Sequence, residues 1–181
     1  MNAGKEHMTK GEYPAAVIEF KNAVQAQPDS VQARLALADA YEHSFDPGSA
    51  EQHLRKAVER GGDADLLLPR IAILMLERGE LEPIVRDFKD RHLKSAEAES
   101  NLRAIVAIAY VSQKRAGLAE EQLKGATANT PAVKLAKAQL LLASGQANQA
   151  LAELNTLPSD TAASWWTLRA LSRVYSAVGN P

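Results

Sequence analysis

The 181-residue sequence contains no cysteine, which excludes disulfides, thiolate metal sites and cysteine nucleophiles. Aromatic residues are scarce at 5%, while hydrophobic residues make up 46%, so alanine and leucine supply much of the apolar content. This balance favours closely packed helices over a β-sandwich, which would need more valine, threonine and aromatic side chains.

Neither sign of charge is in excess, because 21 basic residues stand against 22 acidic ones. The sequence has no basic stripe typical of nucleic-acid binding and no lysine-rich amphipathic helix typical of a membrane surface. No apolar run approaches the ~18 residues that a membrane-spanning helix needs. Residues 1–10 are too polar for a signal peptide. We expect either a cytosolic protein or one whose export signal lies outside this sequence.

The dominant pattern is a triplet of small, large and small residues, spaced four and three positions apart. Its first copy is Ala16, Phe20 and Ala23 in the stretch GEYPAAVIEFKNAVQAQP. Successive copies begin 34, 34, 35 and 31 residues apart, and a fixed period in this range indicates stacked supersecondary units. The later copies are Ala50–Leu54–Ala57, a weaker one at Ile84, Ala119–Leu123–Ala126 and Ala150–Leu154–Leu157.

Residues three and four apart share one helix face, where alanine lets a neighbouring helix approach and the large residue fills the remaining space. A second apolar helix precedes each triplet, and short turns rich in glycine, proline and aspartate join the two. Each unit is therefore predicted to be a helical hairpin. The predicted helices are 2–10, 13–26, 31–44, 47–60, 64–78, 81–92, 97–113, 116–129, 131–144, 147–156 and 162–178.

The 34-residue period, together with Gly11, Tyr13, Ala16, Phe20 and Pro28, resembles the tetratricopeptide repeat (TPR). This resemblance implies an all-α fold, a right-handed α-solenoid of stacked helical hairpins. We expect one array that is a fragment of a longer solenoid, because both ends stop in mid-unit. The expected units are 1–30, 31–64, 65–99, 100–130, 131–160 and the half unit 161–181, and the first-helix pattern recurs at Leu37, Ala38 and Tyr41, at Val106, Ala107 and Tyr110, and at Leu171, Ser172 and Tyr175.

A narrower resemblance lies in residues 13–41, in AEQHLRKAVERG at 50–61 and in AKAQLLLASGQANQALAELNTL at 136–157. These stretches are similar to the long TPR lipoproteins of bacterial PEP-CTERM/exosortase systems, which are found beside exopolysaccharide genes. The resemblance implies a lipid-modified cysteine upstream and a periplasmic, outer-membrane or membrane-anchored lipoprotein. A cytoplasmic location remains the alternative.

In stacked hairpins the first helix of each pair lines a concave groove, so its exposed stripe is the expected partner-binding surface. The middle of this stripe is apolar, which suits an amphipathic helix or an extended apolar peptide. The alternative is that the superhelix closes and buries these side chains against one another. The stripe comprises Asp39, Glu42, Leu66, Arg70, Ile73, Ile105, Ile108, Leu135, Gln139, Leu142, Trp166, Arg169 and Arg173, with Gln32, Leu35, Glu77, Asn101 and Ser112 in the same phase.

Two local departures qualify this picture. The set of lysines, asparagine and arginine with which some TPR proteins clamp a C-terminal carboxylate is absent, since Leu35 and Asp39 occupy its place. Trp165 and Trp166 point about 100° apart on one helix, so we expect Trp165 in the core and Trp166 towards the groove, unless both pack in the core.

The third unit breaks the triplet pattern, because Ile84 replaces the first alanine and Arg91 the second. A bulky residue where neighbours usually touch is expected to widen the helix spacing or change the local twist. Functionally this would be a bend or a docking site; the alternative is sequence drift with local repacking.

The sequence does not favour an enzyme. Its histidines are scattered over separate helices, without an HExxH pair, a glycine-rich phosphate loop or a GxSxG elbow. We therefore expect no cofactor, no metal and no nucleic-acid partner. The predicted function is a non-catalytic protein–protein interaction scaffold that binds a peptide or partner domain in an envelope or exopolysaccharide-export system. The alternatives are a cytosolic adaptor or regulatory domain of a larger protein, and a structural spacer.

Overall fold

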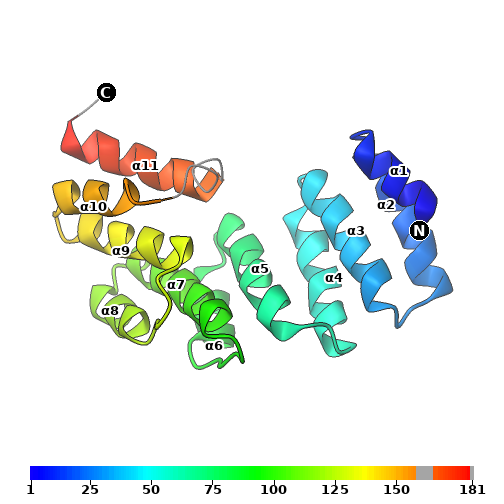
Figure 1. Ribbon diagram of the computed structural model, residues 1–181, viewed down its shortest axis with the longest axis horizontal. Helices are drawn as coiled ribbons and strands as arrows, with labels where there is room; N and C mark the ends of the chain where they lie inside the picture. Colours follow the sequence, from blue (N-terminus) through cyan, green and yellow to red (C-terminus); the bar gives the residue numbers. More distant parts are fainter. Residues whose placement is uncertain (158–164, 180–181) are drawn as a thin grey trace. The chain divides into compact units, whose positions relative to one another are not determined.

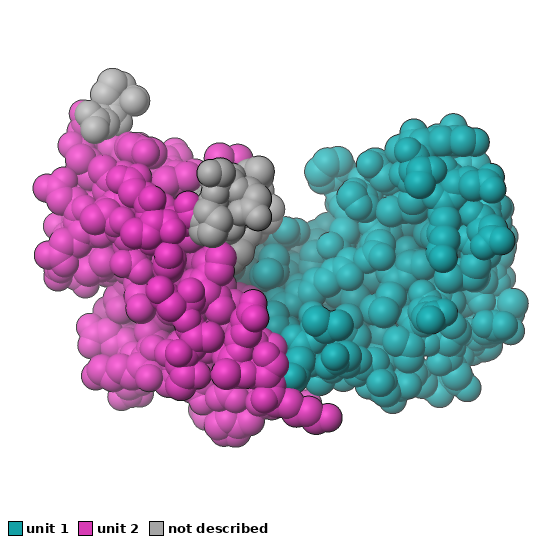
Figure 2. All heavy atoms as spheres, in the orientation of Figure 1, with its two compact units in different colours: residues 1–80 teal, residues 81–181 magenta. Residues whose placement is uncertain are grey.

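A computed structural model describes residues 1–157 and 165–179 of the chain. The described residues form eleven helices and no strand, in the order that the repeat predicts (Figure 1). They fall into two compact units, residues 1–80 (unit 1) and residues 81–181 (unit 2), coloured teal and magenta in Figure 2. The boundary between the units separates the two helices of the expected third hairpin, the one whose triplet is irregular.

Unit 1 consists of five helices, each of which packs against the next along the chain. Its core contains two residues of the first triplet, since Ala16 and Phe20 are buried together with Leu37 from the following helix. A β-carbon on Gly4 would lie 2.5 Å from the Phe20 ring, so only glycine allows the first helix this close. The helices are α1 (Asn2–Thr9), α2 (Tyr13–Ala26), α3 (Val31–His43), α4 (Pro47–Glu59) and α5 (Ala64–Glu77).

Unit 2 contains the remaining helices, with α7 and α9 at its centre. The α7 helix packs against α6, α8 and α9, and α9 packs also against α10 and α11. A hydrophobic cluster of Leu135, Ala138, Ala150, Leu154 and Val174 joins the last three helices. The bounds are α6 (Leu81–Phe88), α7 (Ala96–Ser112), α8 (Ala116–Lys124), α9 (Pro131–Ala143), α10 (Ala147–Leu154) and α11 (Trp165–Val178).

Side-chain caps start the first helix of each hairpin from α3 to α9. Ser30, Asp63, Ser95 and Thr130 each accept a hydrogen bond from a backbone N–H in the first turn of α3, α5, α7 and α9. Such a bond satisfies one of the amides that a helix start leaves without an intrahelical partner. The caps explain why the predicted and observed starts of these helices agree within one residue.

Each of these first helices is followed by a turn residue with positive φ, and so are α1 and α11. The N–H of the next residue then bonds back to a carbonyl of the last helical turn, as Asp46 does to the Tyr41 carbonyl at 2.9 Å. Glycine adopts this conformation without strain, but two of the turn residues are not glycine. The series is Gly11, Phe45, Gly79, Lys114, Gly145 and Gly179, at intervals of 34, 34, 35, 31 and 34 residues, with φ between 58° and 78°.

Two predicted helix ends were wrong. Helix α6 ends at Phe88 rather than at 92, so that Arg91 lies exposed in the following loop and not at the second triplet position, while Ile84 is fully buried. Helix α8 ends at Lys124 rather than at 129, and Gly125 follows it with a right-handed backbone (φ −78°). The chain then leaves the helix, and the Ala128 N–H donates to the Ser100 hydroxyl of α7 at 3.0 Å.

Candidate interaction surface

Three residues of the expected stripe meet in unit 1. Arg70 of α5 reaches the first helix of the preceding hairpin, where its Nε and Nη2 atoms lie 2.7 Å from Glu42 Oε1 and its Nη2 also donates to Asp39. These contacts join residues that are 28 and 31 positions apart in the sequence, with α4 between them along the chain. The sequence placed these three side chains on one stripe, and the structure shows that they form an ion triad.

Burial and charge shift the pKa values of Glu42 and Arg70. Burial raises the pKa of Glu42 above its usual range, Arg70 partly offsets this, and the charges of Asp39 and Glu77 raise it further. Burial alone would lower the pKa of Arg70, but the two carboxylates outweigh it and the pKa is raised. Two carboxylates therefore share one guanidinium, and the Asp39–Glu42–Arg70 triad carries an excess of one negative charge.

The triad remains accessible and has apolar neighbours. About a third to a half of each side chain in the triad is exposed to solvent. Leu66 lies one turn before Arg70 on α5 and is 71% exposed, and the half-buried Ile73 lies one turn after it. We call Asp39, Glu42, Leu66, Arg70 and Ile73 the acidic surface; it offers negative charge beside exposed apolar area.

The stripe expected in unit 2 is different. Ile105, Ile108 and Leu135 are buried, so these three cannot line an open groove, and the alternative of self-burial is the one observed for them. Leu142 is half-buried and packs against the cluster that contains Leu135. The expectation of a continuous apolar groove wall was therefore wrong at these positions, because α7 is enclosed by α6, α8 and α9.

The remaining stripe positions differ in exposure. Gln139 is half-buried, and Arg173 is exposed on α11. The side chains of Trp165, Trp166 and Arg169 lie outside the described residues, so the expectations for them stay predictions.

Ion pairs elsewhere in the molecule were not predicted from the sequence. Glu51 on α4 is only 8% exposed. Its carboxylate forms an ion pair with Arg55 at 2.6 Å and a second one with Arg78, and the second pair links α4 to the end of α5. In unit 2, Glu99 accepts from Arg103 at 2.8 Å and from the Leu93 backbone at 3.2 Å, and these bonds lower its pKa. Both carboxylates hold helices or loops together.

The histidines do not converge. His43 stacks on Tyr13 with ring centroids 4.9 Å apart, and His53 stacks on Tyr41 at 5.7 Å. His7 pairs with Glu12 at 2.6 Å and His92 with Glu99 at 3.2 Å. Within the described ranges, no group of three metal-binding side chains comes together. None of the helices in those ranges is long and apolar enough to cross a bilayer.

Comparison with known proteins shows the fold. No protein-family model and no curated protein sequence matches the chain. Among solved structures, MamA is similar over 99% of this chain and 98% of its own, with a TM-score of 0.63 and 16% identity. PilF of Pseudomonas aeruginosa matches over 98% of this chain and 82% of its own, with a TM-score of 0.60 and 18% identity.

A third similar structure is TTC0263, a thermophilic TPR protein of Thermus thermophilus. It covers 97% of this chain and 95% of its own, with a TM-score of 0.59 and 23% identity. These neighbours are TPR proteins, so the chain has the α-solenoid fold of that class. At these identities the likeness establishes architecture, and function has to be argued from the surface.

Proposed function

We propose that the protein is a non-catalytic protein–protein interaction scaffold whose unit 1 binds a basic peptide segment across α3 and α5. The observation that carries this proposal is the acidic surface, where two carboxylates of α3 share a single arginine of α5. A lysine or arginine of the partner would pair with the carboxylate edges that Arg70 leaves exposed. A large apolar residue beside it would cover Leu66, which is otherwise exposed to water.

The charge balance favours a basic segment over an acidic one. Asp39 and Glu42 are partly exposed and share a single arginine, so an anionic peptide would meet repulsion. Because the side chains are also partly solvated, each added ion pair contributes only about 0.2–1 kcal/mol. Affinity must then come from several such pairs together with apolar burial, as expected for a reversible scaffold.

A peptide-display selection tests this proposal directly. Random 12-residue peptides are selected against the wild-type chain and against Asp39→Asn/Glu42→Gln, in which the shapes are kept and the charges are removed. Selected wild-type binders should combine lysine or arginine with a large apolar residue. Their affinity for the double variant should fall roughly fivefold to thirtyfold, equivalent to about 1–2 kcal/mol.

The matched control is Glu120→Gln/Glu121→Gln on α8, where two exposed glutamates are neutralised in unit 2. This variant changes the net charge equally and should bind the selected peptides as the wild type does. Selection of acidic peptides, or equal loss in both variants, would refute the acidic surface as the binding site. Failure to select any binder with a folded protein would favour the spacer function.

The cellular setting is a further part of the proposal. We place the scaffold in a bacterial envelope or exopolysaccharide-export system, on the resemblance of residues 13–41 and 136–157 to PEP-CTERM/exosortase lipoproteins. The test is the sequence encoded upstream of Met1 in the native gene. A signal segment with a lipid-modified cysteine is expected; a start without one would favour the cytosolic adaptor.

A further inference from the structure

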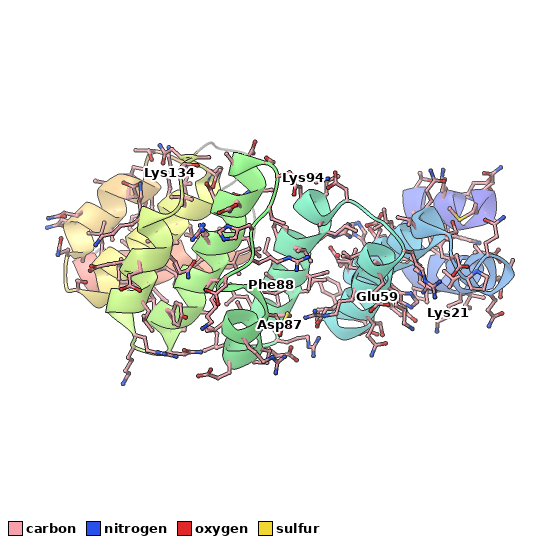
Figure 3. All side chains as sticks on the ribbon, turned by 90° about the horizontal axis from the view of Figure 1, so that it is seen from below. Lys21, Glu59, Asp87, Phe88, Lys94 and Lys134 are labelled. Atoms are coloured by element: carbon pink, nitrogen blue, oxygen red, sulfur yellow. The ribbon has the colours of Figure 1, made fainter. Side chains whose placement is uncertain are left out.

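A second polar surface of unit 1 is built from α2, α3 and α4, and its charge is positive. The Nζ atom of Lys21 lies 5.6 Å from the centroid of the Tyr41 ring, and that ring stacks on His53 at 5.7 Å and 18°. Figure 3 labels Lys21 on α2. With Arg34 on α3 and Lys56 on α4, these residues form what we call the basic cluster: Lys21, Arg34, Tyr41, His53 and Lys56.

Arg34 contributes a buried charge that has no counter-ion among the residues that the structure describes. It is only 7% exposed, its Nη2 atom donates to the Pro28 carbonyl, and its Nε atom has no hydrogen-bond partner among the described residues. Asp29, the acid next to Pro28, pairs with Arg60 at 2.5 Å instead. Buried charges in proteins are normally paired, because removing a guanidinium from water without an anion is unfavourable.

His53 reports the same imbalance from the neighbouring helix. Its Nδ1 atom is buried and has no partner within the described part of the chain. Burial lowers the pKa of His53, and the charges of Lys56, Arg34 and Lys21 lower it further. All three charges that act on the imidazole are therefore positive, and they come from α2, α3 and the histidine's own helix α4.

We propose that the basic cluster binds a phosphate dianion, which supplies the missing negative charge. Lys21 and Lys56 are exposed and flexible, so their ammonium groups can approach the anion from α2 and α4. His53 can donate a hydrogen bond to it, and the Tyr41 ring positions both His53 and Lys21. Arg34 adds a positive charge that acts over distance, since a buried guanidinium is weakly screened by water.

Two sources can present this chemistry: free inorganic phosphate and the phosphomonoester of a phosphorylated side chain. NMR titration of the amides of α2–α4 in the full chain distinguishes them. Inorganic phosphate, a short phosphoserine peptide, its unphosphorylated form and sodium chloride are added in turn at constant ionic strength. Saturable shifts at the basic cluster are expected with phosphate or the phosphopeptide and not with the other two.

The variant Lys21→Gln/Lys56→Gln should weaken this binding at least about tenfold, because it removes two of the charges nearest the anion. Both lysines are exposed, so the fold should be kept. Lys5→Gln/Lys10→Gln changes the same net charge on exposed lysines of the α1 region and should bind as the wild type does.

The outcomes separate cleanly. Equal affinity for phosphate and the phosphopeptide supports a free-phosphate site, and clearly tighter binding of the phosphopeptide supports a phosphorylated partner. Shifts that do not saturate, that chloride reproduces, or that both double variants lose equally would overturn the proposal. The acidic surface on α3 and α5 is unaffected by either lysine pair, so failure here leaves the peptide proposal to its own test.

Discussion

Replacing Phe45 with glycine should stabilise unit 1, although it deletes a large aromatic side chain. Phe45 occupies the positive-φ position of its turn at φ 58°, and it is 93% exposed. A side chain other than glycine costs about 1–2 kcal/mol in this conformation. The ring recovers little of that, because burying the remaining 7% of about 200 Å² is worth only about 0.3 kcal/mol.

The unfolded chain sets the size of the gain. Glycine loses about 0.5–1 kcal/mol more conformational entropy on folding than other residues. Subtracting this and the lost ring contact leaves a net stabilisation of about 0.5 kcal/mol for Phe45→Gly. Phe45→Ala removes the ring but keeps the strained backbone, so it should be neutral or slightly destabilising.

Urea denaturation followed by circular dichroism ranks the stability of wild type, Phe45→Gly and Phe45→Ala. The expected order of stability is Phe45→Gly, then wild type, then Phe45→Ala. The reverse substitution Gly79→Ala, at φ 74° in the equivalent turn, should be destabilising. If Phe45→Gly unfolds at lower urea than Phe45→Ala, the strain argument is wrong, because both variants lack the ring and differ only in the β-carbon at this positive-φ position.

Further substitutions test the packing, the caps and the charges. Gly4→Ala should destabilise by about 1–3 kcal/mol because its β-carbon would meet Phe20, whereas Gly117→Ala on α8, with open space around it, should stabilise by about 0.5–1 kcal/mol in denaturation. Asp46→Ala should cost about 1 kcal/mol at neutral pH, and the difference from wild type should shrink as pH falls through the lowered pKa of Asp46, below 3.8. The raised pKa of Glu42 means that the folded state binds its proton more tightly, so wild type should lose stability relative to Glu42→Gln as pH rises above about 4.5; a constant difference across a pH series would contradict this.

The helix order could be predicted because the repeat marks both the packing face of each helix and the turn residues between helices. Ala16, Phe20, Ala50 and Leu54 are buried where the triplet places them, since residues on one helix face meet the neighbouring helix. The end of α8 could not be predicted from Gly125, because this glycine keeps a right-handed φ of −78° and not the positive φ of a usual helix stop.

Exposure of the expected stripe could not be predicted. Helical phase says which residues share a face, but Leu66 is exposed and Ile105 is buried because different numbers of helices cover α5 and α7 within their own units. The partner of a charge depends on distance in space, so the Arg70 triad and the buried Arg34 required coordinates. The irregular turn at Phe45 carried a usable signal, since Gly11 and Gly79 lie 34 residues on either side of it.

In both units, helices pack on the next helix along the chain or on the one after it. Loop closure between such close partners needs little search, so folding should begin from contacts that form quickly. During synthesis, a hairpin can therefore pack as soon as its own residues and those of the following helix have left the ribosome. Only a short part of the emerging chain would be unpacked at any stage. This limits the time for which its apolar side chains are exposed and can aggregate.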